Sequence, residues 1–437
     1  MKMAFSARNG NGLVGFGCYL VGLLLWFPSV SVLNIGEGSS VQPVVAVGVL
    51  VAALMVYART EKFSLRFLIW FGSLIFLLII QAFTLINKTG DLSLYFKGMT
   101  SLALSLFMLA LGYLVAKQTA LSRTFFNGYV AGGLVSSFWA ITQYFFWSVL
   151  KIDFPFLVGI QNSLSFAKYA TNDSYIKLGR GFACTPEPSI LFVLLAVCLA
   201  LLLYSRRSVL LIFLVLAGIL STASAGIISV LPLSLVFLLY VSNYINAKMA
   251  FTIFVSSVAG AILFIAVSVQ NMNLSNIAHD TNIIARVSNI SNNASFLSRT
   301  NSMLVALEMF NSRPLLGWGV QSEEIASTLL TNSTSIEENK GINSLLLSML
   351  VWFGSLFTII CMYPVVNLFF KNDKEFAQSR LFVVITLIGA FISISYYNLY
   401  NIWFAFGMAA HTMDAKSKYT KTSQVRLQKQ SKDICTI

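Results

Sequence analysis

This chain has few charged residues. Only 10% of its 437 residues are Asp, Glu, Lys or Arg, whereas a soluble domain contains about 25%. Hydrophobic residues make up 57% of the chain, and the mean hydropathy is +0.79. The composition excludes an ordinary soluble domain and predicts an all-α polytopic membrane protein.

Residues that serve metal or redox chemistry are also few. The chain has two histidines, His279 and His411, and five cysteines without a paired-cysteine motif. We therefore expect no transition-metal site and no disulfide framework. An Asp-x-Asp motif and a Gly-rich phosphate loop are both missing from the sequence.

Long apolar segments dominate what is present. A helix needs roughly 20 apolar residues to cross a bilayer, and we predict twelve transmembrane helices. They are Gly12–Leu33, Val41–Tyr57, Phe67–Ile86, Met99–Ala116, Phe125–Val149, Ser189–Tyr204, Val209–Leu220, Gly226–Val241, Met249–Val269, Ser344–Phe370, Leu381–Ser395 and Leu399–Met413. None has a charged residue near its middle, where ion-coupled transporters usually keep such groups. Chemistry is therefore expected at a membrane face.

The distribution of basic residues predicts the orientation. With the N-terminus in the cytoplasm, the cytoplasmic segments hold 19 of the 29 basic residues and five of the 16 acidic ones. Lys and Arg are enriched on the cytoplasmic side, so we expect both termini there. The net charge of +13 is then a property of membrane topology, and no nucleic-acid partner is expected.

This topology divides the chain into alternating membrane and loop regions. Five transmembrane helices lie in residues 1–149, four in 189–269 and three in 344–413. Residues 150–188 and 270–343 form two larger periplasmic loops, and residues 414–437 form a basic cytoplasmic tail. Membrane lipids are accordingly expected partners.

The large loop contains a helical pattern. Met303, Ala306, Leu307 and Phe310 fall on one face of a helix. Pro314 is expected to end this helix near Arg313, and Leu315–Gly319 has the composition of a turn. We interpret the segment as an amphipathic helix on the outer membrane surface or over a cavity.

Arginines on the outer face are candidates for binding a phosphorylated substrate, because the guanidinium fork suits phosphate oxygens. Arg180 lies with Glu187 in "KLGRGFACTPEPSI", directly before a predicted span. The large loop contributes Arg286, Arg299 and Arg313. A simpler alternative stays open at this point. In it, Glu187 is a helix cap and the arginines contact lipid headgroups or pair with acidic residues of the loop, namely Glu308, Glu323 and Glu324.

Two stretches resemble the superfamily of bacterial O-antigen ligases and Wzy-type O-antigen polymerases. One is "SRTNSMLVALEMFNSRPLLGWGV", followed by "NSLLLSMLVWFG" (Asn343–Gly354). It is similar to the family's pattern of an Arg opening a periplasmic helix, a PLLGxG turn, then His or Asn, a small polar residue, nine residues and Gly. The other is "RGFACTPEPS", which resembles the family's R-G-x-F…EPS segment in the preceding periplasmic loop.

The resemblance implies a GT-C-like membrane glycosyltransferase. Its substrates would be oligosaccharides linked to undecaprenyl pyrophosphate, used as donor and acceptor at the periplasmic face of the bacterial inner membrane, without metal or other cofactor. It assigns the catalytic roles to Arg180, Arg299 and Glu187, with the arginines on the pyrophosphate and Glu187 as base. Asn343, Arg286, Arg313 and Trp318 are the expected substrate-binding residues. The first outer loop has Glu37 alone where metal-dependent GT-C enzymes have paired acidic residues.

Three functions stay open within this interpretation. The favoured one is a polymerase that joins repeat units, with a chain-length regulator as a further candidate partner. The second is a ligase that transfers the glycan to lipid A-core. Its usual histidine corresponds to Asn343 here, with His279 as a distant substitute. The third, from another class, is a flippase or polysaccharide transporter. The chain departs from the family at Ala225, where members often carry Arg.

Overall fold

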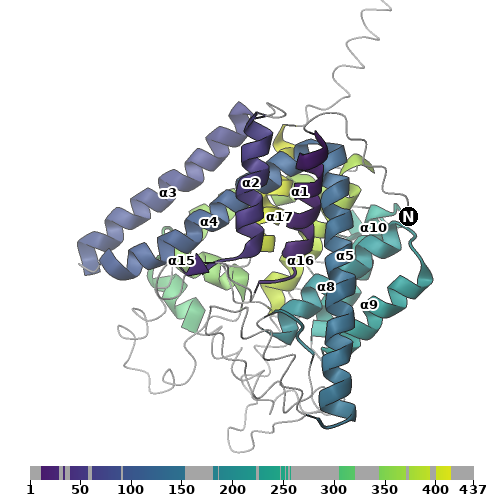
Figure 1. Ribbon diagram of the computed structural model, residues 1–437. Coiled ribbons are helices and arrows are strands. Elements are labelled where there is room, and N and C mark those ends of the chain that lie inside the picture. The colour runs from purple at the N-terminus through teal and green to yellow at the C-terminus, as the bar shows by residue number, and fades with distance from the viewer. Residues whose placement is uncertain are drawn as a thin grey trace, which may run out of the picture.

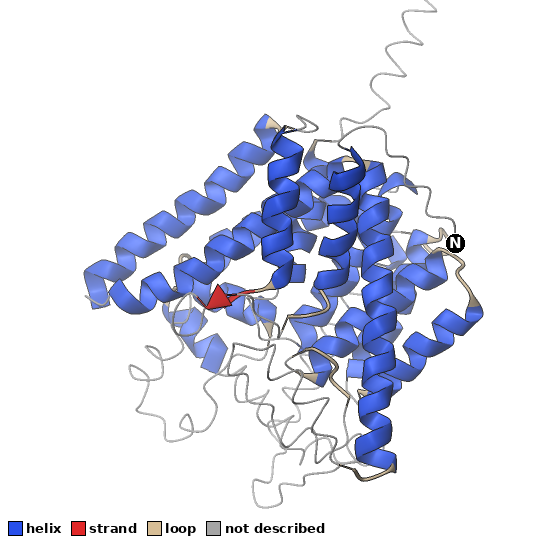
Figure 2. Cartoon of the chain, in the orientation of Figure 1, coloured by secondary structure: helices blue, strands red, loops and turns tan. Residues whose placement is uncertain are grey.

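The computed structural model is almost entirely helical over the residues that it describes (Figures 1 and 2). These are residues 11–28, 33–34, 40–57, 62–89, 92–152, 181–185, 187–222, 226–246, 248–250, 252–253, 256, 305–319, 344–370, 374–393 and 400–414. The prediction of a helical protein is confirmed.

Helices occupy the predicted apolar segments, apart from the ninth, which lies largely outside the described residues. The α-helices are α1 (Asn11–Leu24), α2 (Pro43–Tyr57), α3 (Leu65–Thr89), α4 (Leu92–Lys117), α5 (Thr119–Tyr144), α8 (Pro188–Tyr204), α9 (Val209–Ser221), α10 (Gly226–Val241), α15 (Leu345–Phe370), α16 (Ala377–Ser393) and α17 (Tyr400–Ala410). α5 continues as a π-helical turn, η1 (Phe145–Val149), and short 3₁₀ turns are η3 (Lys374–Phe376) and η4 (His411–Met413). Residues 305–312 form a further helix.

The first predicted span is wrong at its C-terminal end. α1 stops at Leu24, and Leu33 belongs to a two-residue strand, β1 (Leu33–Asn34), that pairs antiparallel with β2 (Ser40–Val41). Pro28 follows the end of α1, and a proline disfavours helical backbone at the residue before it and lacks the amide donor.

Two of the described helices are long and apolar enough to cross a membrane alone. They are Leu65–Phe83 within α3, and α15. Leu102–Lys117 and Thr119–Val149 would form a third span if taken together, although the pair is bent by 118°. Shorter apolar helices include α1, α2, α8 and α9. The helical membrane character is supported, while the number of twelve spans stays a prediction.

Glycines bring two pairs of helices into close contact. A Cβ on Gly22 of α1 would lie 2.2 Å from the Phe125 carbonyl oxygen of α5, and one on Gly128 would lie 1.9 Å from that of Tyr19. Small residues allow such backbone approach between helices in a membrane protein. α4 and α17 meet in the same way through Gly112 and Gly407.

α8 is the central helix of the bundle. Every residue from Pro188 to Leu202 is buried, and α5, α9, α10 and α16 pack around it. A helix that is apolar on all sides must be enclosed in this way or by lipid. The first residues of α8 are therefore held firmly, and Glu187 precedes them directly.

One end of the bundle carries a polar cluster. The Asp414 carboxylate accepts hydrogen bonds from Ser64, before α3, and from Tyr113 of α4.

Arg380 of α16 is buried, and its guanidinium lies 5.4 Å from the ring of Tyr240. The predicted span begins at Leu381, which leaves Arg380 in the cytoplasmic connection before it. α16 instead begins at Ala377, four residues earlier, so Arg380 lies within the helix.

Candidate functional site

The two halves of the large-loop motif meet at a break in α15. Gly354 has φ 76° and ψ 175°, which is not helical. In an uninterrupted helix the amides of Ser355 and Leu356 would donate to the carbonyls of Val351 and Trp352. The break separates these groups and leaves two donors and two acceptors for another segment.

The turn at residues 314–319 supplies the missing partners. It docks against the break, so that each freed group of α15 bonds to the backbone of the turn. The bonds run from Trp318 N to Val351 O (2.7 Å), Gly319 N to Trp352 O (2.9 Å), Ser355 N to Pro314 O (2.8 Å) and Leu356 N to Leu315 O (3.4 Å). The turn and the helix therefore form one hydrogen-bonded unit, and neither is complete alone.

Two glycines make this docking possible. Gly317 and Gly354 both have positive φ, 68° and 76°, a conformation that costs little for glycine alone. A Cβ on Gly354 would lie 2.2 Å from the Leu315 oxygen, and one on Gly317 would lie 2.6 Å from the Gly354 nitrogen. The spacing of these glycines in the sequence motif thus follows from backbone contact.

Gln81 of α3 bonds to both the docked turn and α15. Its side-chain amide nitrogen donates both to the Leu316 carbonyl of the turn and to the Trp352 carbonyl of α15. The side chain is buried, with 2% of its surface exposed. One amide therefore links three elements that are far apart in the sequence.

The helix over residues 305–312 packs through a face that overlaps the predicted one but is shifted. Ala306 and Met309 are buried and Phe310 is half-buried, but Leu307 is 40% exposed. The half-buried Arg313 follows Met309 by four residues and continues this face, whereas Ser312 is exposed. Met303 lies outside the described residues.

Arg313 and Trp318 form a stacked pair at the end of this helix. The Arg313 guanidinium lies 4.2 Å from the centre of the Trp318 ring, within the range of a cation–π contact. Trp318 Nε1 donates to the Met309 carbonyl at 2.8 Å and to Ser312 Oγ at 3.1 Å. Partial burial lowers the pKa of Arg313, but an arginine remains charged at any physiological pH.

A second cluster surrounds the segment 181–187. Gln143 of α5 is fully buried, and its Oε1 accepts hydrogen bonds from the amides of Phe182 (3.0 Å) and Ala183 (2.8 Å). Gly181 N donates to the Ser221 carbonyl at the end of α9 at 3.0 Å. The segment is thereby fixed to α5 and α9 before it enters α8.

Glu187 is held at the N-terminus of α8. Its carboxylate accepts a hydrogen bond from Ser189 Oγ at 3.0 Å, and its side chain is half-buried. Thr185 Oγ1 lies within hydrogen-bonding distance of the backbone carbonyl oxygens of Phe182 (2.7 Å) and Glu187 (2.9 Å). The positive end of a helix favours an anionic side chain at this position, so Glu187 has a fixed backbone and a suitable electrostatic setting.

Residues 209–362 match the family model described as O-antigen ligase. The match confirms the resemblance to the O-antigen polymerase and ligase superfamily. The matched segment, roughly a third of the chain, contains α9, α10, the docked turn and most of α15. A comparison with curated proteins finds no match.

The matched segment does not contain the whole candidate site. Gln81, Gln143 and Glu187 all precede it in the chain. Gln81 bonds to Leu316 and Trp352 within it, and the helices that carry or follow the other two, α5 and α8, pack against α9. The structure brings Arg313 and Trp318 together, and it places Glu187 in the separate cluster of α5, α8 and α9. Arg180, Arg286, Arg299 and Asn343 lie outside the described residues.

The neighbours of two of these residues are nevertheless fixed. Gly181, next to Arg180, is bonded to Ser221 as described above. Ser344, next to Asn343, donates from Oγ to the Phe391 carbonyl of α16 at 2.7 Å. Within the described ranges, no group of three or more His, Cys, Asp or Glu side chains could hold a metal ion.

Gln81 and Gln143 were not predicted as site residues, because neither carries a charge. A polar side chain in a span nevertheless needs a hydrogen-bond partner and often joins helices. Each glutamine lies in the last third of its predicted span, and that position is the signal that could have identified both.

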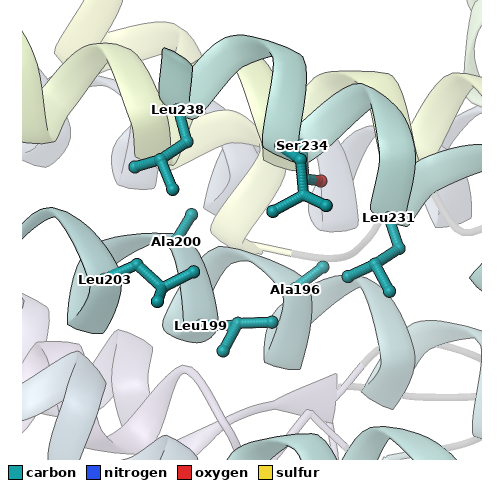
Figure 3. Close-up of a pocket in the computed structure, with 8 residues that line it drawn as sticks. Ala196, Leu199, Ala200, Leu203, Leu231, Ser234 and Leu238 are labelled. Atoms are coloured by element: carbon teal, nitrogen blue, oxygen red, sulfur yellow. The ribbon is translucent and has the colours of Figure 1, made fainter. Parts of the chain in front are cut away.

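A small apolar pocket lies elsewhere, between α8 and α10 (Figure 3). Its walls are alanine and leucine side chains with one serine, and Ser234 Oγ already donates to the Val230 carbonyl at 2.7 Å. The pocket offers an apolar surface and no free polar group, so it adds nothing to the chemistry of the site.

Proposed function

We propose that this protein is a glycosyltransferase that polymerises a bacterial surface polysaccharide such as O-antigen. It joins oligosaccharide repeat units carried on undecaprenyl pyrophosphate at the periplasmic face of the inner membrane. The observation that carries the proposal is the interlocked turn and broken helix. This unit lies inside the segment that matches the O-antigen ligase family, and both halves of the family pattern are needed to build it.

The proposed topology has twelve spans in a GT-C-like arrangement, with both termini cytoplasmic. Contacts between distant residues support it. Ser64, Tyr113 and Asp414, which the alternation of spans puts on the cytoplasmic side, bond to one another. Gly181 and Ser221, assigned to the periplasmic side, do the same.

The proposed reaction needs three kinds of group. An acceptor sugar hydroxyl attacks the anomeric carbon of the donor glycan, the carbon–oxygen bond to the pyrophosphate breaks, and the lipid pyrophosphate leaves. Arg180 and Arg299 stabilise the charge of the leaving group, and Glu187 accepts the hydroxyl proton. Arg286, Asn343 and Trp318 are proposed to bind substrate, and no metal or cofactor takes part.

A polymerase is favoured over a ligase because of Asn343. An imidazole can accept a proton near neutral pH, whereas an amide can only donate and accept hydrogen bonds. Asn343 can therefore orient an acceptor sugar but cannot deprotonate it. The ligase remains the second candidate, since the matching family model carries that description.

The test is the surface polysaccharide of a deletion strain, separated by electrophoresis. A lost polymerase leaves single repeat units on the lipid A-core, and expressing this chain restores a ladder of polymer lengths. Free polymer with bare core would instead identify a ligase, and the absence of any exported repeat would identify a flippase. Restoration of glycan attachment in a ligase-deleted strain would overturn the polymerase assignment.

A further inference from the structure

Three N–H groups along α5 and η1 are buried without a hydrogen-bond partner. They are Trp139 Nε1, Gln143 Nε2 and Trp147 Nε1. The residues are four apart, so they lie on one side of the helix at steps of about 6 Å. Native proteins leave few buried polar groups unpaired, and each one calls for an explanation.

Three other indoles in the described part of the chain donate to backbone carbonyls. Trp26 Nε1 donates to the Tyr129 carbonyl at 2.7 Å, Trp70 Nε1 to Ile360 at 2.8 Å, and Trp318 Nε1 to Met309 at 2.8 Å. Indoles of this fold can thus pair with backbone carbonyls, whereas those of Trp139 and Trp147 do not.

Gln143 and Trp147 lie against the segment that carries the proposed catalytic carboxylate. Gln143 Oε1 accepts from Phe182 and Ala183, and this pairing orients the amide so that its nitrogen is the unpaired atom. The Trp147 ring stacks on Phe182, with ring centres 5.6 Å apart. Thr185 Oγ1 bonds to the backbone carbonyls of Phe182 and Glu187, so Gln143, Trp147 and the backbone of Glu187 share one local network. Trp139 precedes Gln143 by about one turn of the same helix.

The chemistry of the row indicates its ligand. All three groups are neutral donors, two belong to indole rings, and the helix turns into a π-helix beside Trp147, a feature frequent at functional sites. Pyrophosphate calls for charged donors such as arginine. Neutral donors suit the hydroxyl and acyl carbonyl oxygens of a sugar.

We propose that Trp139, Gln143 and Trp147 donate hydrogen bonds to neutral sugar oxygens of the lipid-linked glycan, and so form a glycan-binding row beside Glu187. This inference rests on the proposed function and names the residues that recognise its sugar. The donors are buried in the ligand-free protein, so binding requires the side chains packed over them to move aside.

Trp147→Phe tests the row, because it removes the N–H and keeps a ring against Phe182. With purified protein and the lipid-linked oligosaccharide, we expect KM to rise about three- to tenfold, the value of one neutral hydrogen bond, with kcat little changed. The thermal stability of the ligand-free protein should stay the same or increase, since an unpaired donor is removed.

Trp26→Phe is the matched control. Its N–H has a partner within the protein, so this variant should lose thermal stability and keep the wild-type KM. If Trp147→Phe is poorly folded, Gln143→Glu replaces it, because a carboxylate still accepts from Phe182 and Ala183 but offers no amide donor. That variant should raise KM as well.

Three results would overturn the glycan-binding row. An unchanged KM in a stable Trp147→Phe protein would show that the donors bind no glycan and are unpaired only because of imperfect packing. An equal loss of affinity for polyprenyl pyrophosphate without sugar would assign them to the pyrophosphate. A wild-type protein that transfers no glycan at all would reject the proposed function itself, which the first two results leave intact.

Discussion

Gln81 on α3 and Gln143 on α5 each attach a motif-bearing segment to the helices, but they use opposite ends of the amide. Gln81 donates from its nitrogen to two carbonyls, Leu316 and Trp352. Gln143 accepts with its oxygen from two amides, Phe182 and Ala183, and its nitrogen stays unpaired. Both N–H donors of Gln81 are therefore bonded within the protein. Those of Gln143 have no partner in the protein, and we propose that they bind the glycan.

This difference indicates that the docked turn serves stability and that the region at α5 serves catalysis. The docked turn at α15 is a rigid unit whose backbone groups satisfy one another. The second region contains a carboxylate on the segment 181–187 and, along α5 and η1, an unpaired amide nitrogen and two unpaired indole nitrogens. We therefore expect substitutions at the first region to affect mainly stability, and substitutions at the second to affect mainly catalysis.

The largest effect is expected at Glu187. Glu187→Gln keeps the size of the side chain and can still accept from Ser189, but it removes a base. Turnover should fall by about 10²- to 10⁴-fold at an unchanged protein level and thermal stability. Polymer length in a complemented deletion strain and turnover of the purified protein measure this. Full activity of the glutamine variant would remove proton transfer from the role of Glu187.

Gly354→Ala should have the largest effect on stability. The new Cβ meets the Leu315 oxygen at 2.2 Å and the backbone has positive φ, so the turn must leave the helix break. We expect a loss of more than about 3 kcal/mol in the free energy of unfolding. Thermal unfolding in detergent provides the measurement.

Gly72→Ala in α3 is the control for this glycine. A Cβ at Gly72 has no neighbour within 4 Å, and alanine is the better helix former. Its unfolding temperature should be equal to the wild type or higher. If Gly354→Ala behaves like Gly72→Ala, the docked turn is not a rigid unit.

Exchanging each glutamine for glutamate tests the comparison directly. At Gln81 a carboxylate would face two carbonyl oxygens, and the loss of both hydrogen bonds plus a buried anion should cost about 2–4 kcal/mol. At Gln143 a carboxylate would still accept from two amides, so the folded protein should tolerate it. Unfolding temperatures of the two variants give the answer. Equal destabilisation would contradict the opposite use of the two amides.

Much of the helical fold could be predicted because the length of each apolar segment can be counted directly in the sequence. The segments of α2, α8, α9 and α10 lie within two or three residues of their predicted bounds. The break in α15 could not be predicted, since the residues around Gly354 are as apolar as the rest of that helix. It depends on a partner turn 35 residues away; the family pattern contains both segments but does not show that they bond to each other.

The candidate site was predicted less well, for a similar reason. Glu187, Arg313 and Trp318 were recognised through charge and family resemblance, but Gln81 and Gln143 carry no charge and belong to no motif. Their importance comes from carbonyls and amides that only the folded chain brings within reach. The buried face of the helix at 305–312 was shifted for the same cause, because Met309 rather than Leu307 meets the neighbouring elements.

The smallest expected effect concerns Arg313, which was predicted to bind substrate and which stacks on Trp318. Lysine keeps the positive charge but loses the planar group that stacks on an indole. If the stack is structural, Arg313→Lys should lower stability by about 0.5–1 kcal/mol and leave turnover nearly unchanged. A large loss of turnover in a stable Arg313→Lys protein would instead place the guanidinium on the pyrophosphate. That result would give the docked turn a direct part in catalysis, so stability and catalysis would no longer be assigned to separate regions.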